Sequence, residues 1–137
     1  MIARILAMLA ALVLHQGALA EETGVAIELN KLEQVEGACR AFLVIENDTG
    51  AGFEALALDL VVFDVDGVIA ERLAVDLAPL AAGKTSVKAF DIAGLACADA
   101  GRFLMNTVLD CRNAGDAEDA CTGPIVPRGR GGLDFIG

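Results

Sequence analysis

The sequence contains no tryptophan and no tyrosine, and its only histidine is His15. Basic residues are also scarce, since 10 Lys and Arg stand against 20 Asp and Glu, for a net charge of −10. Nucleic-acid phosphates and anionic membrane surfaces are bound by clusters of Lys and Arg. The acidity therefore argues against nucleic acid and against anionic membranes as partners.

The first twenty residues have the three parts of a secretory signal peptide. Arg4 supplies the positive charge, residues 5–14 are apolar, and Ala18-Leu19-Ala20 matches an A-x-A cleavage site. The apolar run is too short to span a bilayer. We expect a signal helix over residues 1–20 that is cleaved after Ala20, which leaves 117 of the 137 residues without a membrane span. An uncleaved anchor is the alternative. The Ala-rich composition favours a bacterial periplasmic or secreted protein.

Cleavage would remove His15, and with it the most common general base. Nucleophilic catalysis needs a base beside the nucleophile. The available combination is Ser86 with Lys84 or Lys88, and this spacing does not match an S-x-x-K motif. Paired carboxylates can cleave glycosides, but the chain has only phenylalanine to form a sugar platform. The sequence therefore predicts a protein that is not an enzyme and has no catalytic residue and no cofactor.

Most of the remaining sequence is strand-like, with alternating apolar residues between turn-rich segments. Alternation places Ile69 on the inward face of its strand and Leu109 on the same face as Phe103. Asp66-Gly67 predicts a two-residue type I′ hairpin. No long helical pattern is present, so we expect an all-β antiparallel sandwich of about six or seven strands within residues 21–113. The predicted strands are residues 25–32, 38–47, 53–65, 68–77, 85–92 and 102–111.

The composition changes after Asn113, where Gly, Pro and charged residues dominate. Such a segment cannot bury enough apolar surface to become ordered by itself. We therefore predict a flexible tail over residues 114–137. Its apolar end, formed by Leu133, Phe135 and Ile136, is a candidate partner-binding segment that orders when a partner binds.

Three polar patterns are candidate sites. Asp59 lies in the longest apolar strand and needs a partner if its face is covered, for which Arg72 or Lys88 would serve. Residues 64–67 resemble the start of a calcium loop, but the twelfth position is Val75 instead of the glutamate that such a loop requires. A hairpin turn explains these residues better, so no metal site is predicted. Residues 47–49 form a formal glycosylation sequon, to which we assign no role in a bacterial envelope protein.

Three segments together resemble the FxLYD-type domains, which are small immunoglobulin-like sandwiches of bacterial envelope and secreted proteins. The segments are residues 46–50, 58–69 and 77–85, within a match that covers residues 38–92. The resemblance implies an immunoglobulin-like strand order and an envelope setting. This family has no common catalytic residues, so none is transferred, and the cysteines are not part of its pattern.

The four cysteines allow three disulfide pairings. They contain no C-x-x-C motif, and the mature chain has no histidine, which disfavours a metal site. In an immunoglobulin-like order the second and sixth predicted strands run parallel, so Cys39 and Cys97 lie at one end of the sandwich. Cys111 lies about 30 Å from that end and can reach only Cys121. This order implies the disulfides Cys39–Cys97 and Cys111–Cys121.

These features favour a non-catalytic, secreted or periplasmic β-sandwich that binds or assembles with another envelope protein. Edge strands would offer a route to partners by β-addition. A periplasmic protein that binds a small ligand or a metal is the alternative. The sequence does not define the partner or the oligomeric state.

Overall fold

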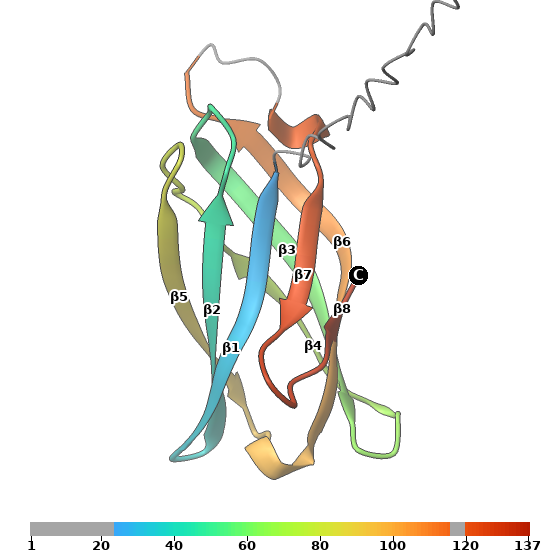
Figure 1. Ribbon diagram of the computed structural model, residues 1–137. Helices are drawn as coiled ribbons and strands as arrows, with labels where there is room; N and C mark the ends of the chain where they lie inside the picture. Colours follow the sequence, from blue (N-terminus) through green and yellow to red (C-terminus); the bar gives the residue numbers. More distant parts are fainter. Residues whose placement is uncertain (1–23, 116–119) are drawn as a thin grey trace, which may run out of the picture.

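The computed structural model describes residues 24–115 and 120–137, which form two four-stranded β-sheets packed face to face. Figure 1 shows the two layers, and the buried apolar side chains of both sheets form one hydrophobic core. The described residues contain no α-helix. The predicted all-β sandwich is therefore confirmed, while the predicted signal peptide lies outside the described residues. The elements are β1 (Val25–Val35), β2 (Ala38–Asn47), β3 (Phe53–Asp64), β4 (Ile69–Asp76), β5 (Thr85–Ala93), η1 (Cys97–Asp99), β6 (Ala100–Asn113), η2 (Ala120–Thr122), β7 (Ile125–Gly129) and β8 (Phe135–Ile136).

The first sheet has the strand order β5-β2-β1-β7. Its first three strands form because apolar residues alternate with polar ones, which gives each strand one apolar face. Ile27 and Leu29 of β1 and Leu43 and Ile45 of β2 are fully buried on the inner face. The tight turn at residues 36 and 37 sets the antiparallel register of the near ends of β1 and β2, and a register shift between Leu29 and Lys31 then brings Leu29 opposite Leu43.

The second sheet has the order β4-β3-β6-β8, with β3 at its centre. Leu56, Leu58, Leu60 and Val62 of β3 point inward and are buried against the first sheet. Residues on the opposite face of β3 are also shielded, because β3 has a neighbour on each side. The predicted central strand is therefore confirmed, and its outer face carries the buried Asp59.

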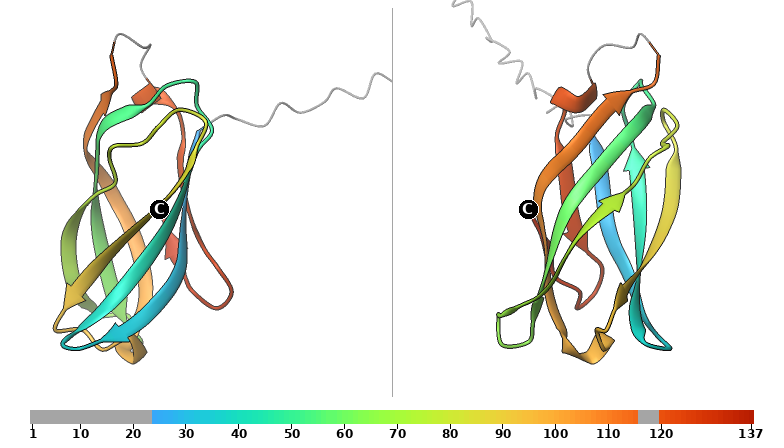
Figure 2. Two further views of the ribbon diagram at one scale, coloured as in Figure 1. Left: turned by 90° about the vertical axis from the view of Figure 1, so that its left-hand side faces the viewer. Right: turned by 180° about the vertical axis from the view of Figure 1, so that it is seen from behind.

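The prediction of a flexible tail over residues 114–137 is wrong for the segment that forms β7 and β8. β7 pairs in parallel with β1, and β8 pairs in parallel with β6, so the sandwich is not purely antiparallel. β1 and β6 would otherwise expose unpaired backbone groups along the same side of the sandwich. The last segment of the chain satisfies both edges, as Figures 1 and 2 show from opposite sides.

Irregular pairing changes which residues face inward on β4 and β6. The register between β3 and β4 shifts next to Phe63, and the register between β3 and β6 shifts at several points. A shift of one residue moves a side chain to the other face of a sheet. Ile69 is therefore 62% exposed and Leu109 is 54% exposed, whereas Phe103 is buried. The predictions that Ile69 points inward and that Leu109 shares a face with Phe103 are wrong.

The hairpin between β3 and β4 also differs from the prediction. Gly67 has a φ of +81°, but no non-glycine residue in the described ranges has a positive φ. A type I′ turn needs a positive φ at both central residues, so Asp66-Gly67 does not form one. The chain turns instead through the longer loop of residues 65–68, which projects from the lower end of the sandwich in Figure 1.

Candidate binding surface

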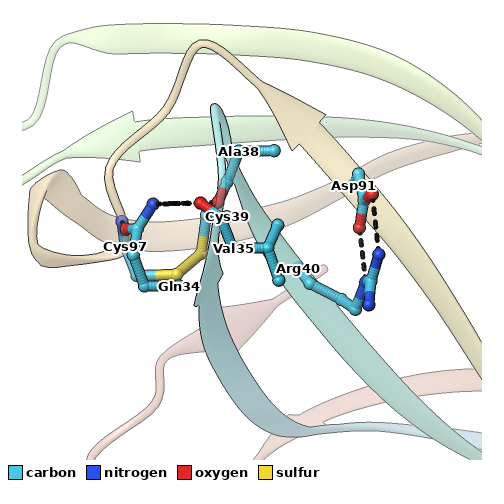
Figure 3. The surroundings of a disulfide bond; sticks show 7 residues. All are labelled: Gln34, Val35, Ala38, Cys39, Arg40, Asp91 and Cys97. Atoms are coloured by element: carbon cyan, nitrogen blue, oxygen red, sulfur yellow. Dashed lines mark hydrogen bonds and ion pairs between the residues drawn. A yellow bond between two sulfur atoms is a disulfide. The ribbon is translucent and has the colours of Figure 1, made fainter.

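The disulfide between Cys39 and Cys97 joins the start of β2 to η1, at the end of the sandwich that is drawn lowest in Figure 1. Its two Cα atoms are 4.9 Å apart, and Cys39 is fully buried. Figure 3 shows Gln34 beside this disulfide. The Gln34 side chain accepts a hydrogen bond from the Cys97 backbone N–H (2.8 Å) and donates to the carbonyl of Ala38 (2.9 Å). The surroundings are therefore structural, and Gln34 had no distinguishing signal in the sequence.

The disulfide between Cys111 and Cys121 joins the end of β6 to η2, with Cα atoms 5.9 Å apart. It fastens the start of the C-terminal segment to the second sheet. Both predicted pairings are thus confirmed, and the described residues include no free cysteine. Disulfides of this kind form and persist in oxidising environments outside the cytoplasm. The two disulfides therefore suggest an extracytoplasmic protein.

Asp59 is the buried carboxylate on the outer face of β3, at 4% exposure. Arg72 of β4 donates two hydrogen bonds to it, from Nε to Oδ1 (2.9 Å) and from Nη2 to Oδ2 (2.8 Å). Asn106 of β6 donates a third, to Oδ2 (2.8 Å). These donors hold the pKa of Asp59 below its ordinary value, with Arg72 as the larger cause. Of the two predicted partners, Arg72 is the one that binds it.

This network ties three of the four strands of the second sheet together, since its members come from β4, β3 and β6. Both carboxylate oxygens of Asp59 accept hydrogen bonds from side chains of the protein itself. A carboxylate that is held in its charged form by three hydrogen bonds is a poor general acid. The arrangement therefore explains Asp59 as a structural residue.

The apolar end of the tail, which was predicted to bind a partner, packs largely against the protein's own core. Phe135 is 4% exposed and belongs to the hydrophobic core, and Leu133 packs against that core. A side chain that fills its own core is not available to a partner, so the prediction is wrong for Phe135. Ile136 points the other way and is 40% exposed.

Exposed aliphatic residues gather instead at the hairpin between β3 and β4. Val65, Val68 and Ile69 are 68%, 61% and 62% exposed, and we call these three residues the hairpin ridge. Single exposed aliphatic residues are ordinary on protein surfaces, whereas a cluster marks a candidate interaction site. The sequence did not indicate this cluster, because alternation alone placed Ile69 inside.

A hollow of about 500 Å³ lies beside the hairpin ridge, on the outer face of the second sheet. Its apolar lining includes Phe63 of β3, Leu104 of β6 and Ile136 of β8. Leu104 and Ile136 are directly paired across the β6–β8 ladder. Arg102 and Asp134 line it as well, joined by an ion pair of 2.6 Å. The hollow therefore combines apolar and charged groups.

The open edges of the two sheets are less suited to binding than the sequence suggested. β5 and β4 end their sheets on one side. Lys88 of β5 is paired opposite the buried Leu43, and Glu71 of β4 opposite the buried Val62, so each edge carries a charged residue on its inward face. Inward charges on edge strands oppose pairing with another chain, which disfavours β-addition at these edges.

The other candidate patterns have structural explanations. In the described ranges, no group of three or more His, Cys, Asp or Glu side chains is placed to hold a metal ion. Asn47 of the sequon is 2% exposed and donates to the carbonyls of Ala51 (2.9 Å) and Ala81 (3.1 Å), which leaves no room for a glycan. None of the helices among the described residues is long and apolar enough to cross a membrane.

Comparison with known proteins found no family model that matches the chain, no similar curated protein and no matching solved structure. The candidate site therefore depends on the geometry of this molecule alone.

Proposed function

We propose that this protein is a non-catalytic binding or assembly module of the bacterial envelope, exported to the periplasm or secreted by a signal peptide over residues 1–20. The observation that carries the proposal is the hairpin ridge of Val65, Val68 and Ile69 beside a hollow with an apolar lining. Exposed apolar side chains that border a cavity are typical of surfaces that bind other proteins. The two disulfides support an extracytoplasmic location.

An immunoglobulin-like strand order, as in the FxLYD-type domains, is part of this proposal. In such a sandwich the first, second and fifth strands share one sheet, and the third and sixth share the other. β1, β2 and β5 lie together in the first sheet, while β3 and β6 lie in the second. The positions of these five strands support the order. β4 departs from the constant-type arrangement, in which the fourth strand lies with the first and second, because it pairs with β3 in the second sheet. The parallel pairing of β7 and β8 is a feature of this chain.

A triple variant tests the function. Val65→Ser, Val68→Ser and Ile69→Ser together remove the hairpin ridge, and Val87→Ser is the control because Val87 of β5 is 64% exposed and lies on the other sheet. The tagged, oxidised proteins are crosslinked in cells of the source organism. We expect a stoichiometric partner that the triple variant loses and the control keeps. A partner that the triple variant retains, or no partner at all, would contradict the proposal. Thermal denaturation checks that each variant is folded.

The hollow also keeps the small-ligand alternative as a second candidate, because its volume of about 500 Å³ lies within the range of small-molecule sites. Native mass spectrometry of the purified domain distinguishes the two functions. A retained small molecule that dissociates in a Leu104→Glu variant would favour a ligand-binding protein. A bare protein mass is expected for a protein-binding module.

A further inference from the structure

The loop that presents the hairpin ridge is held by one carboxylate. Asp64 Oδ1 accepts hydrogen bonds from the backbone N–H groups of Asp66 and Val68, each 2.9 Å long. The Asp64 N–H donates to the Val68 carbonyl (2.7 Å), and the Gly67 N–H donates to the Asp64 carbonyl (3.0 Å). A loop fixed in this way loses little conformational entropy when a partner binds. Val65 and Val68 are therefore presented in a preformed arrangement.

The wall of the hollow is equally constrained, because β6 passes very close to the base of the hairpin. A Cβ atom at Gly101 would lie 2.4 Å from the carbonyl oxygen of Asp64, so only glycine fits at this position. Arg102, which follows Gly101, is paired opposite Phe63 on the outer face of the sheet. The close approach of the two backbones thus sets the distance between the hairpin ridge and the floor of the hollow.

The charges around the hollow are unequal. Three carboxylates, Asp64, Asp66 and Asp134, line it together with a single cation, Arg102. Arg102 Nε already binds Asp134 Oδ2 at 2.6 Å. Among the described residues, the Asp66 carboxylate takes part in no ion pair. The rim of the hollow therefore has an excess of negative charge at the tip of the hairpin.

We propose that the occupant of the hollow is a segment of another protein that inserts an aliphatic side chain flanked by lysine or arginine. This inference rests on the proposed function of the same surface. The aliphatic side chain would contact Phe63, Leu104 and Ile136, while the flanking cation would lie near Asp66. A second copy of this chain is a poorer fit, since it would bring the same three carboxylates against themselves.

Photocrosslinking tests the proposal in the full chain. A photoreactive phenylalanine analogue replaces Val68, or Val87 as the control with a similar exposure, and the crosslinked peptides are sequenced by mass spectrometry. We expect Val68 to crosslink to one partner segment in which an aliphatic residue is adjacent to Lys or Arg. We expect Asp66→Asn to weaken binding of that segment by up to about fivefold, and more at low salt than at high salt.

The outcomes separate this inference from the function on which it rests. A crosslinked segment with neutral or acidic flanks, or a crosslink to a second copy of the chain, would overturn the proposed chemistry and leave a binding module. Binding that Asp66→Asn does not change would also overturn it. Absence of any crosslink from Val68, or equal crosslinking from Val87, would overturn the proposed partner chemistry and the proposed binding function together.

Discussion

Phe135 of β8 is paired in register with Phe103 of β6, and both side chains are buried in the core. A strand of only two residues is thus held by one large apolar side chain. The same contact makes the C-terminal segment part of the domain, so a truncation at residue 122 would remove core packing as well as chain. Such a truncation would not be a clean test of partner binding.

Phe135→Ala should lower the free energy of unfolding by about 3–5 kcal/mol, the cost of removing a buried phenylalanine side chain. The control is Ile136→Ala, which alters an exposed neighbour and should change stability by no more than about 0.5 kcal/mol. Urea denaturation of the oxidised protein measures both. Equal stability of the two variants would show that β8 contributes no core packing.

The two disulfides should differ in their contribution to stability. Cys39–Cys97 closes a loop of 58 residues and Cys111–Cys121 a loop of 10. Loop-closure entropy assigns about 4 kcal/mol to the first and about 3 kcal/mol to the second. Replacing Cys39 and Cys97 by alanine should lower the free energy of unfolding more than replacing Cys111 and Cys121. Cys39 is fully buried, so its replacement also removes core packing and widens the difference between the two double variants. Thermal denaturation of the two double variants gives the comparison, and a reversed order would contradict it.

Asp59 should make the free energy of unfolding fall as the pH is lowered into the acid range. Its folded-state pKa is held below the value of about 3.9 for an unpaired aspartate, mainly by the hydrogen bonds from Arg72. The stabilisation is therefore present above about pH 4 and is lost as the pH falls through the folded-state pKa. Asp59→Asn should lower the Tm at pH 7, and the gap to the unaltered protein should narrow toward pH 2. A constant gap across this range would exclude the charged network as its cause.

The inward charges of the edge strands should limit association. Lys88→Val places an aliphatic residue on the inner face of β5, where it would stabilise the monomer but remove an obstacle to edge pairing. We expect faster aggregation by light scattering during mild heating. Lys84→Val is the matched control, since it removes the same charge from the connection before β5. If both variants aggregate alike, the effect is due to net charge and not to the edge.

The sequence predicted those parts of the fold in which each strand carries its own alternation. Residues 38–47 were predicted as a strand with the bounds that β2 has, and the inward face of β1 was placed correctly. The disulfide pairing followed from the implied strand order. The β-bulges were not predictable from alternation, because the register depends on the neighbouring strand, and this is why Leu109 was placed on the wrong face.

β7 and β8 were missed for a different physical reason. β7 contains Pro127 and ends at Gly129, and β8 has only two residues, so neither has a strand pattern of its own. Their conformation is imposed by the free edges of β1 and β6. The hairpin ridge was missed for a related reason, since exposure of Val65 and Val68 depends on how far the hairpin projects beyond the sheets.

The pairing of β1 with β7 joins Val25 to Ile125, which are 100 positions apart in the chain. Contacts between such distant positions give a fold a high contact order, and folds of this kind reach the native state in milliseconds to seconds instead of microseconds. The newly made chain therefore stays unfolded for a long interval before the sandwich closes. In the export that we propose for this protein, slow closure would keep the chain in an unfolded form that can be threaded through a membrane.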